Sequence, residues 1–494
     1  MILTRCLMKK MIKKIVEKYQ SLPPGIKAGF WFVICSAIQN GASFISMPFL
    51  VHILTTTEYG IYSVFRSWIN IIAIFATLKM NTDVFNNAMY KYPGKRNEYT
   101  ASVQSVSISD TVLCFLIYWL FKDFWNSVFG LPTEISIMIF LQLLLSMGYL
   151  LWTAKQRYEY KYKAMVIATA IFSVLYLIVP ILAGYYADKG VKLLAVIYSG
   201  VAVQVFFGVF FTAYNYVKGK CFFNKEYWRF AIGFNLPLIP HFLSSIILGE
   251  SDRIMIKNMV GSAEAGIYSF VYTVSIVINI ITEAVRNTII PFTYKALGNK
   301  DFKSLRSAVN FILLMVGGLI LVFSAIAPEF IMLLATEEYY DAIKLVPVIS
   351  LSSYFGFLYT VFSTVEFFFE RNKLIAIASV TGAATNVILN LLLIPLFGYY
   401  AAGYTTLVSY VLYSLVHFVF MKRVCKKELA SANVYDNRTI FFISLAVTAV
   451  VFLLLLIYDY IWLRYVALIL PSLVAVVNRR KISEKLSAIK GDKG

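Results

Sequence analysis

Residues 58–63 read Glu-Tyr-Gly-Ile-Tyr-Ser, and residues 264–269 read Glu-Ala-Gly-Ile-Tyr-Ser, an offset of 206 positions. A second pair of similar stretches lies at 163–170 and 373–380, at an offset of 210. Self-similarity at a long and nearly constant spacing is the sequence sign of a duplicated structural unit. The chain is therefore predicted to contain two copies of one unit.

The composition indicates that these units lie in a membrane. Of the 494 residues, 60% are hydrophobic and 14% are charged, and the mean hydropathy is +0.73. A soluble chain would have too little polar surface to cover itself, and a membrane-spanning helix needs about 20 mostly apolar residues. We predict fourteen spans, near 27–50, 60–78, 101–121, 135–152, 164–184, 193–214, 230–248, 266–283, 307–327, 345–369, 374–395, 402–421, 439–457 and 462–477.

The net charge of +19 indicates how the chain is oriented in the membrane. With the N-terminus placed inside, 37 of the 45 Lys and Arg residues fall in inner segments and 7 in outer loops, while Arg66 lies within a span. Cytoplasmic loops of membrane proteins collect Lys and Arg, so both termini are predicted to be cytoplasmic. The excess of positive charge then gives no reason to expect a nucleic acid partner.

The fold predicted is an all-α integral membrane protein. Because six spans separate the two copies, they share one orientation and form two parallel six-helix repeats, or lobes, around a central cavity. The predicted divisions are a basic amphipathic segment (1–26), an N-terminal lobe (27–215), a cytoplasmic linker (216–229), a C-terminal lobe (230–421), a linker with two extra helices (422–478), and a basic cytoplasmic tail (479–494). For the first segment, an ordinary solvated helix is the alternative to one lying on the membrane surface.

The sequence contains no recognised catalytic, ATP-binding or metal-binding motif. The five cysteines and three histidines are scattered, without zinc-ligand or disulfide spacing. The longest predicted outer loop, 328–344, has 17 residues, which leaves little room for a catalytic domain. We therefore predict a protein that is not an enzyme, with no cofactor apart from a coupled proton or sodium ion.

Polar residues recur on one face of several spans, which predicts a shared hydrated cavity. The stripe in span 2 includes Arg66, and the stripe in span 8 includes Tyr272. Spans 4 and 10 carry matching stripes, in which Ser352, Gly356 and Tyr359 belong to span 10. The predicted substrate-cavity residues are Arg66, Asn70, Asn279, Glu283, Arg286, His241, Asp252, Arg253, Gln156 and Glu366.

Structural roles for these residues are the alternatives to substrate binding. A charge within a span is costly and usually faces the bundle interior or water, but Arg66 could equally pair with Asp110 as structural support. Near the inner ends of their spans, Glu283 and Arg286 could simply reach the interface. Asp252 and Arg253 could likewise be interfacial, because they follow the predicted end of span 7. Pro237 and Pro240 are expected to kink that span.

Two stretches resemble a known family. Phe-Asn-Leu-Pro-Leu-Ile-Pro-His-Phe-Leu-Ser-Ser-Ile-Ile-Leu-Gly-Glu-Ser-Asp-Arg-Ile-Met-Ile at 234–256, with the following 261–270, resembles the signature region of bacterial polysaccharide-biosynthesis flippases of the Wzx type. The stretch 390–410 resembles the second signature of that family. The family belongs to the multidrug/oligosaccharidyl-lipid/polysaccharide exporter superfamily. The resemblance to it covers the whole chain in span number and repeat.

The resemblance implies a transporter in the bacterial cytoplasmic (inner) membrane. Its cargo would be an undecaprenyl-pyrophosphate-linked oligosaccharide, flipped from the inner to the outer leaflet by alternating access for O-antigen or capsule synthesis. Cationic cavity residues of related flippases hold the pyrophosphate, which nominates Arg253 within the signature stretch; Arg66 is nominated from the polar stripe of span 2 alone. Membrane lipid, the lipid-linked oligosaccharide and other polysaccharide-assembly proteins are the implied partners. A cation-coupled multidrug exporter of the same superfamily is the alternative, and a membrane-bound glycan polymerase or ligase is a third hypothesis.

Overall fold

The computed structural model describes residues 24–466, and every regular element in this range is helical. Eleven helices are long and apolar enough to cross a membrane, and the bent pair Lys225–Leu238 and Phe242–Met259 makes a twelfth span if counted as one. The all-α membrane fold is thus confirmed, while the predicted count of fourteen is not reached in the described residues. The first predicted span coincides with α2 (Pro24–Ile53). The predicted segments 1–26, 462–477 and 479–494 fall wholly or mostly outside the described range.

The helices separate into two compact units. The first contains residues 1–53 and 72–239, and the second contains residues 54–71 and 240–494. The end of α3 (Thr56–Thr77) belongs to the first unit, and the rest of α3 belongs to the second. The first unit also holds α2, α4 (Asp83–Lys91), α5 (Arg96–Leu120), α6 (Lys122–Phe129), α7 (Thr133–Tyr158), α8 (Tyr162–Tyr186), α9 (Lys192–Gly219), α10 (Lys225–Asn235) and η1 (Leu236–Leu238). The second unit holds α11 (Ile239–Met259), α12 (Ser262–Ser275), α13 (Ile278–Gly298), α14 (Phe302–Leu334), η2 (Glu337–Lys344), α15 (Leu345–Phe368), α16 (Asn372–Phe397), α17 (Tyr399–Glu428) and α18 (Asn437–Leu456).

The grouping of α3 with the second unit differs from the lobes predicted at 27–215 and 230–421. The reason lies in the repeated motif itself, because its two glycines pack against each other. A Cβ atom on Gly60 would lie 1.7 Å from the carbonyl oxygen of Ser262 and 2.9 Å from the backbone nitrogen of Gly266. Small residues let helix backbones approach closely within a membrane. The duplicated Gly-Ile-Tyr-Ser therefore marks a helix crossing between α3 and α12.

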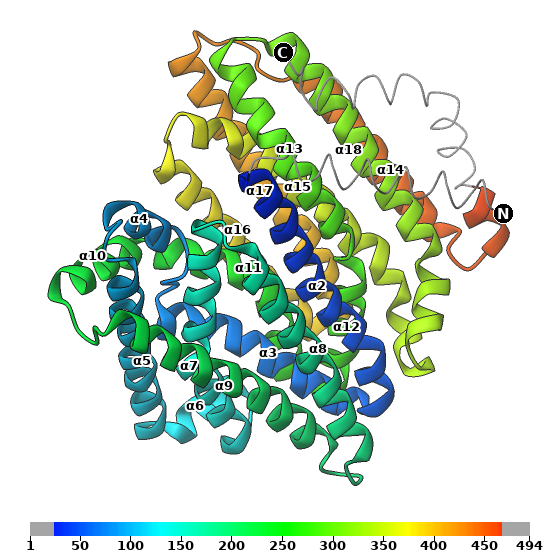
Figure 1. Cartoon of the computed structure of the whole chain (residues 1–494). Helices are drawn as coiled ribbons and strands as arrows, with labels where there is room; N and C mark the ends of the chain where they lie inside the picture. Colours follow the sequence, from blue (N-terminus) through cyan, green and yellow to red (C-terminus); the bar gives the residue numbers. More distant parts are fainter. Residues whose placement is uncertain (1–23, 467–494) are drawn as a thin grey trace, which may run out of the picture. The chain divides into compact units, whose positions relative to one another are not determined.

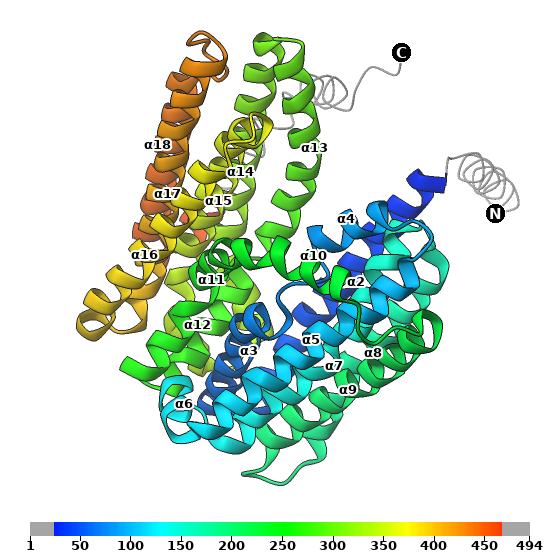
Figure 2. The same cartoon turned by 90° about the vertical axis from the view of Figure 1, so that its left-hand side faces the viewer.

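In the first unit, α5, α7 and α9 are joined by buried amides and small residues. The Asn215 side chain of α9 donates hydrogen bonds to Oε1 of Gln104 on α5, at 2.8 Å, and to the carbonyl oxygen of Gly148 on α7, at 3.0 Å. Gly148 and Gly208 have no room for a Cβ, which brings α7 and α9 close together (Figures 1 and 2). These contacts use polar and packing forces, since apolar surface alone gives no driving force between helices in lipid.

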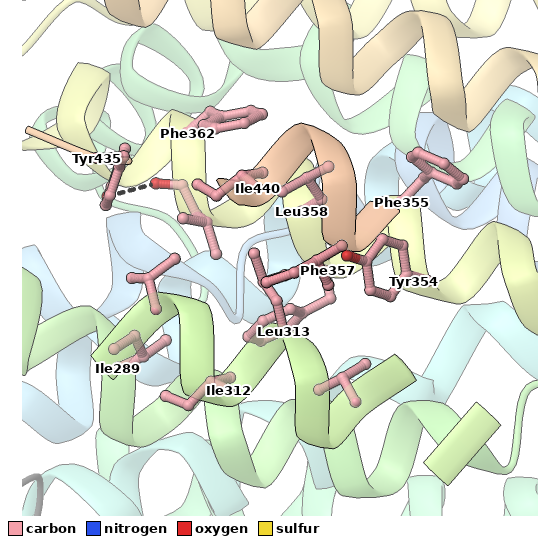
Figure 3. Packing of buried hydrophobic residues seen from close by; sticks show 14 of the residues in the cluster. Ile289, Ile312, Leu313, Tyr354, Phe355, Phe357, Leu358, Phe362, Tyr435 and Ile440 are labelled. Atoms are coloured by element: carbon pink, nitrogen blue, oxygen red, sulfur yellow. Dashed lines mark hydrogen bonds between the residues drawn. The ribbon is translucent and has the colours of Figure 1, made fainter. Parts of the chain in front are cut away.

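In the second unit, α15 is the central helix. Within its most apolar window, 94% of the span is buried, so its polar face contacts protein and not lipid. Figure 3 shows Tyr354, Phe357 and Leu358 of α15 packed among side chains of α13, α14 and α18. The Tyr435 hydroxyl donates a hydrogen bond to the Val361 carbonyl at 2.8 Å and so ties the segment before α18 to α15.

A break in the helical path lies where a kink is expected from Pro237 and Pro240. The short helix η1, which contains Pro237, separates α10 from α11. A proline removes a backbone donor and clashes with the preceding turn, which bends a helix. Helix α11 extends to Met259, eleven residues beyond the predicted end of span 7 at 248. Asp252 and Arg253 consequently lie inside a helix.

Candidate functional site

A cavity of about 250 Å³ lies within the second unit, among α12, α13, α15 and α17. It is lined by Tyr272, Ile276, Asn279, Glu283, Arg286, Ser352, Ser353, Gly356, Tyr359 and Tyr410. Seven of these residues belong to the polar stripes of spans 8 and 10. The structure thus brings the two stripes together around one space. Three of the predicted site residues, Asn279, Glu283 and Arg286, meet there.

The charges of the cavity lining balance. Nη1 of Arg286 lies 2.7 Å from Oε2 of Glu283, one helical turn away on α13. The Glu283 side chain is 54% exposed, which leaves the ion pair open to water at the cavity rim. The rest of the polar lining consists of hydroxyl groups and one amide. Such a surface can offer donors and acceptors to a polyhydroxylated molecule without attracting a particular sign of charge.

Arg253 adjoins the wall of this cavity. Its guanidinium lies 4.7 Å from the centroid of the Tyr272 ring, a cation–π contact, and Tyr272 lines the cavity. Arg253 also forms a salt bridge with Glu250, one turn earlier on α11. The Glu250 carboxylate accepts further hydrogen bonds from Ser67 at 2.7 Å and from Asn70 at 2.9 Å, both on α3. The predicted residue Asn70 therefore contacts Glu250 and is not among the residues that line the cavity.

Arg66 and Arg253 share a neighbour. The charges of both guanidinium groups act on the hydroxyl of Tyr59, which is buried at the start of α3. The two arginines nominated from sequence for an anionic head group therefore come from helices that meet in the second unit. Whether Arg66 pairs with Asp110 stays a prediction.

Asp252 occupies a polar cluster that is buried within the protein. Its side chain is 1% exposed. Oδ2 accepts hydrogen bonds from Tyr268 and Thr406, each at 2.6 Å, and Oδ1 accepts one from Asn390 at 2.6 Å. Asn386 joins the cluster through Asn390 at 3.3 Å. The cluster links α11, α12, α16 and α17.

The remaining predicted residues lie elsewhere. Gln156 is buried in the first unit, 7% exposed on α7, and so does not belong to this cavity. The side chain of His241 lies outside the described residues. Glu366 is buried on α15 and contacts His417 on α17 at 2.8 Å.

Four polar residues at the site were not among the sequence predictions. Ser353 and Tyr410 line the cavity, Glu250 holds Arg253, and His417 pairs with Glu366. Two of them carried a usable signal, because Glu250 lies in the first signature stretch, one turn before Arg253, and Tyr410 ends the second. Ser353 and His417 carried none, since their roles depend on the packing of α15 against α17.

A multi-span helical bundle with an internal polar cavity is an arrangement found in membrane transporters. No group of His, Cys, Asp and Glu able to hold a metal ion occurs among residues 24–466. Comparison with known proteins gives the family. Residues 26–297, more than half of the chain, match the family model described as polysaccharide biosynthesis protein. The chain belongs to this polysaccharide-biosynthesis family, and the resemblance of its signature stretches to Wzx-type flippases agrees with the match.

Individual relatives agree with this placement. The Lsg locus putative protein 1 of Haemophilus influenzae is 24% identical over 361 residues, which cover 68% of this chain and 83% of the relative. The fold is similar to that of the lipid II flippase MurJ in its inward closed conformation, with a TM-score of 0.66 and 14% identity over 89% of this chain and 98% of MurJ. An inward-facing multidrug resistance MATE transporter of the MOP superfamily gives a TM-score of 0.59 and 14% identity over 80% and 96% of the two chains. The chain thus has the candidate spans of a multi-pass membrane protein and a fold similar to that of flippases and multidrug exporters.

Proposed function

We propose that the protein flips an undecaprenyl-pyrophosphate-linked oligosaccharide from the inner to the outer leaflet of the bacterial inner membrane. The product would serve synthesis of a surface polysaccharide, O-antigen or capsule. The proposal rests on one observation in this chain of the polysaccharide-biosynthesis family: an arginine lies against the wall of a neutral, hydroxyl-rich cavity. Such a pairing suits a cargo that has an uncharged glycan and an anionic head group.

The two parts of the cargo fit different residues. Tyr272, Tyr359 and Tyr410 offer rings and hydroxyls to sugar, together with Asn279. Guanidinium groups match the geometry of phosphate oxygens, and Arg253 provides one that is only 12% exposed. In this proposal the glycan enters the cavity, and the pyrophosphate passes the two arginines.

The direction of transport is consistent with membrane energetics. Both termini are proposed to be cytoplasmic, because 37 of the 45 basic residues then lie inside. An anion that moves outward travels with an inside-negative potential, which contributes ~2.3 kcal/mol per unit charge per 100 mV. A cation that accompanies the head group would remove this gain, so coupling to a proton or a sodium ion is part of the proposal. Membrane lipid and other polysaccharide-assembly proteins remain the proposed partners.

Arg66 provides a test of the cation role. We expect Arg66→Ala to reduce delivery of glycan to the outer leaflet at least tenfold, and Arg66→Lys to retain more activity, because lysine keeps the charge without the planar fork. Delivery is measured in cells that carry the variant as the sole copy, with protein abundance matched to wild type. Equal delivery by Arg66→Ala and wild type would make Arg66 an ordinary packing residue.

The proposed function is tested by depletion of the protein in its native cell. Lipid-linked oligosaccharide is then expected to accumulate on the cytoplasmic leaflet, while its periplasm-accessible fraction falls. Normal outer-leaflet delivery in depleted cells with no second flippase gene would contradict the proposal. Increased drug sensitivity with unchanged surface glycan would instead support the multidrug-exporter alternative.

A further inference from the structure

Glu366 and His417 form a fully buried acid–base pair in the second unit. Oε1 of Glu366 lies 2.8 Å from Nδ1 of His417, and neither side chain has exposed surface. Six other salt bridges in the described part of the chain have exposed surface on both of their partners. Burial of an ion pair is expensive, so this pair needs a reason beyond stability.

Each member of the pair keeps one polar atom without a partner. Oε2 of Glu366 and Nε2 of His417 are both buried, and neither forms a hydrogen bond with any described residue. Asp252, a second buried acid in the described residues of the unit, differs because both of its carboxylate oxygens accept hydrogen bonds. The Glu366–His417 pair therefore has free positions for a proton or for water.

The number of protons on the Glu366–His417 pair determines its net charge. With Nδ1–H donated to an ionised carboxylate and Nε2 bare, the pair carries one net negative charge. A further proton on Nε2 or on Oε2 makes the pair neutral. Because a medium of low dielectric constant disfavours net charge, the dry pair holds this proton. Hydration stabilises the charged form and lets the proton leave.

One aromatic ring separates the pair from the cavity. Tyr359 lines the cavity and also stacks on the His417 imidazole, with ring centroids 5.5 Å apart and planes at 25°. Tyr413 packs against the imidazole at 4.8 Å and against Tyr359 at 4.3 Å. A displacement of Tyr359 would connect the pair to water in the cavity.

The titratable groups that face the pair are the phenols of Tyr359 and Tyr413. Several charged groups on the helices packed against α15 and α17 have partners of their own. These partnered groups are Glu283 with Arg286 on α13, Arg306 of α14 with the Asn433 carbonyl, Arg371 with Glu428, Lys422 of α17 with Asn433, and Arg438 of α18 with Phe442.

We propose that Glu366 and His417 bind the proton that is coupled to transport. The proton stays bound while the cavity is closed over the pair, and it leaves to cavity water when Tyr359 moves and the cavity opens. The inference rests on the proposed transport function and names its coupling ion. It also assigns Tyr359 as the residue that separates the proton site from the substrate cavity.

The test measures how pH controls opening of the cavity, in the absence of cargo. The full chain is placed in lipid nanodiscs with its five native cysteines replaced by serine and with Ser353→Cys as a reporter in the cavity wall. The rate of labelling by a water-soluble maleimide is followed from about pH 5.5 to 8.5, with and without Glu366→Gln. The ratio of the two rates cancels the ionisation of the reporter thiol. Glu370→Gln, an exposed acid one turn later, is the matched control.

Glutamine imitates the protonated acid and cannot release a proton. The labelling rate of the reporter protein with native Glu366, divided by the rate of its Glu366→Gln variant, is therefore expected to rise with pH. The rise should reach up to about tenfold per pH unit across the titration of one proton. With His417→Gln the carboxyl group loses a partner that favours its ionised form, so the midpoint moves to higher pH. Glu370→Gln should behave as the parent protein does.

A ratio that is constant with pH would overturn the proton site, because a purely structural role of Glu366 changes the rate equally at every pH. An unchanged midpoint in His417→Gln would remove histidine from the site. Since no cargo is present, these results do not depend on the glycolipid. A pH-dependent ratio together with normal glycan delivery in depleted cells would keep the proton site and reject the proposed cargo.

Discussion

Replacement of Gly60 by alanine is expected to destabilise the protein strongly, although it adds one methyl group. The new Cβ would lie 1.7 Å from the Ser262 carbonyl oxygen, and the corresponding atom in Gly266→Ala would lie 2.2 Å from the Thr56 carbonyl oxygen. Overpacking in a core typically costs ~1–3 kcal/mol when side chains can adjust. Here the obstacle is backbone in both directions, so we expect a loss of at least about 4 kcal/mol, a large part of the ~5–15 kcal/mol that stabilises a typical protein.

Gly318→Ala is the matched control, because Gly318 also lies within a long apolar helix, α14, but has no atom within 4 Å of its Cβ position. This change should be neutral or stabilising by about 0.5–1 kcal/mol, since alanine favours the helix. Both variants are compared by yield of monodisperse protein and by thermal unfolding in one detergent. Equal stability of Gly60→Ala and Gly318→Ala would show that α3 and α12 do not cross at these glycines.

Arg253→Ala is expected to abolish transport. The arginine is 12% exposed, it neutralises Glu250, and its guanidinium covers the ring of Tyr272 at the cavity wall. Removal of one partner of a buried ion pair typically costs ~3–5 kcal/mol, because the remaining charge is uncompensated. The single variant therefore confounds a role in cargo binding with the stranded carboxylate of Glu250.

The double variant Arg253→Ala with Glu250→Ala separates the two roles. It removes both charges, so stability should recover, and the difference from the single variants measures their coupling. If Arg253 binds the head group, folded protein returns but delivery of glycan stays at least tenfold below wild type. Restoration of both stability and glycan delivery would show that Arg253 serves only to neutralise Glu250.

Much of the fold could be predicted because the hydrophobic pattern of each span is local. The spans over 164–184 and 374–395, for example, coincide with α8 and α16. The end of span 7 could not be predicted in this way, because hydropathy falls at Glu250, Asp252 and Arg253 although the helix continues to Met259. These residues are accommodated by partners on other helices, such as Asn390 and Thr406 around Asp252, which no window of local sequence contains.

The candidate site was predictable in part for the same reason. The stripes of spans 8 and 10 followed from helical periodicity, and they meet around one cavity. The polar stripe of span 2 lies on α3, which contributes no residue to the cavity lining. There Asn70 contacts Glu250. The pairing of Glu366 with His417 joins positions 51 residues apart and depends on the packing of α15 against α17, so neither residue alone indicated it.

The most direct test of the account is a flipping assay with purified components. The full chain is reconstituted into liposomes together with undecaprenyl-pyrophosphate-linked oligosaccharide from the native cell, and the fraction of glycan accessible to an external glycosidase is followed over time. We expect wild-type protein to make inner-leaflet glycan accessible, and Arg253→Ala with Glu250→Ala to leave it protected in liposomes that contain equal amounts of folded protein. Equal accessibility in liposomes with wild-type protein and with no protein, under an imposed membrane potential and pH gradient, would contradict the account.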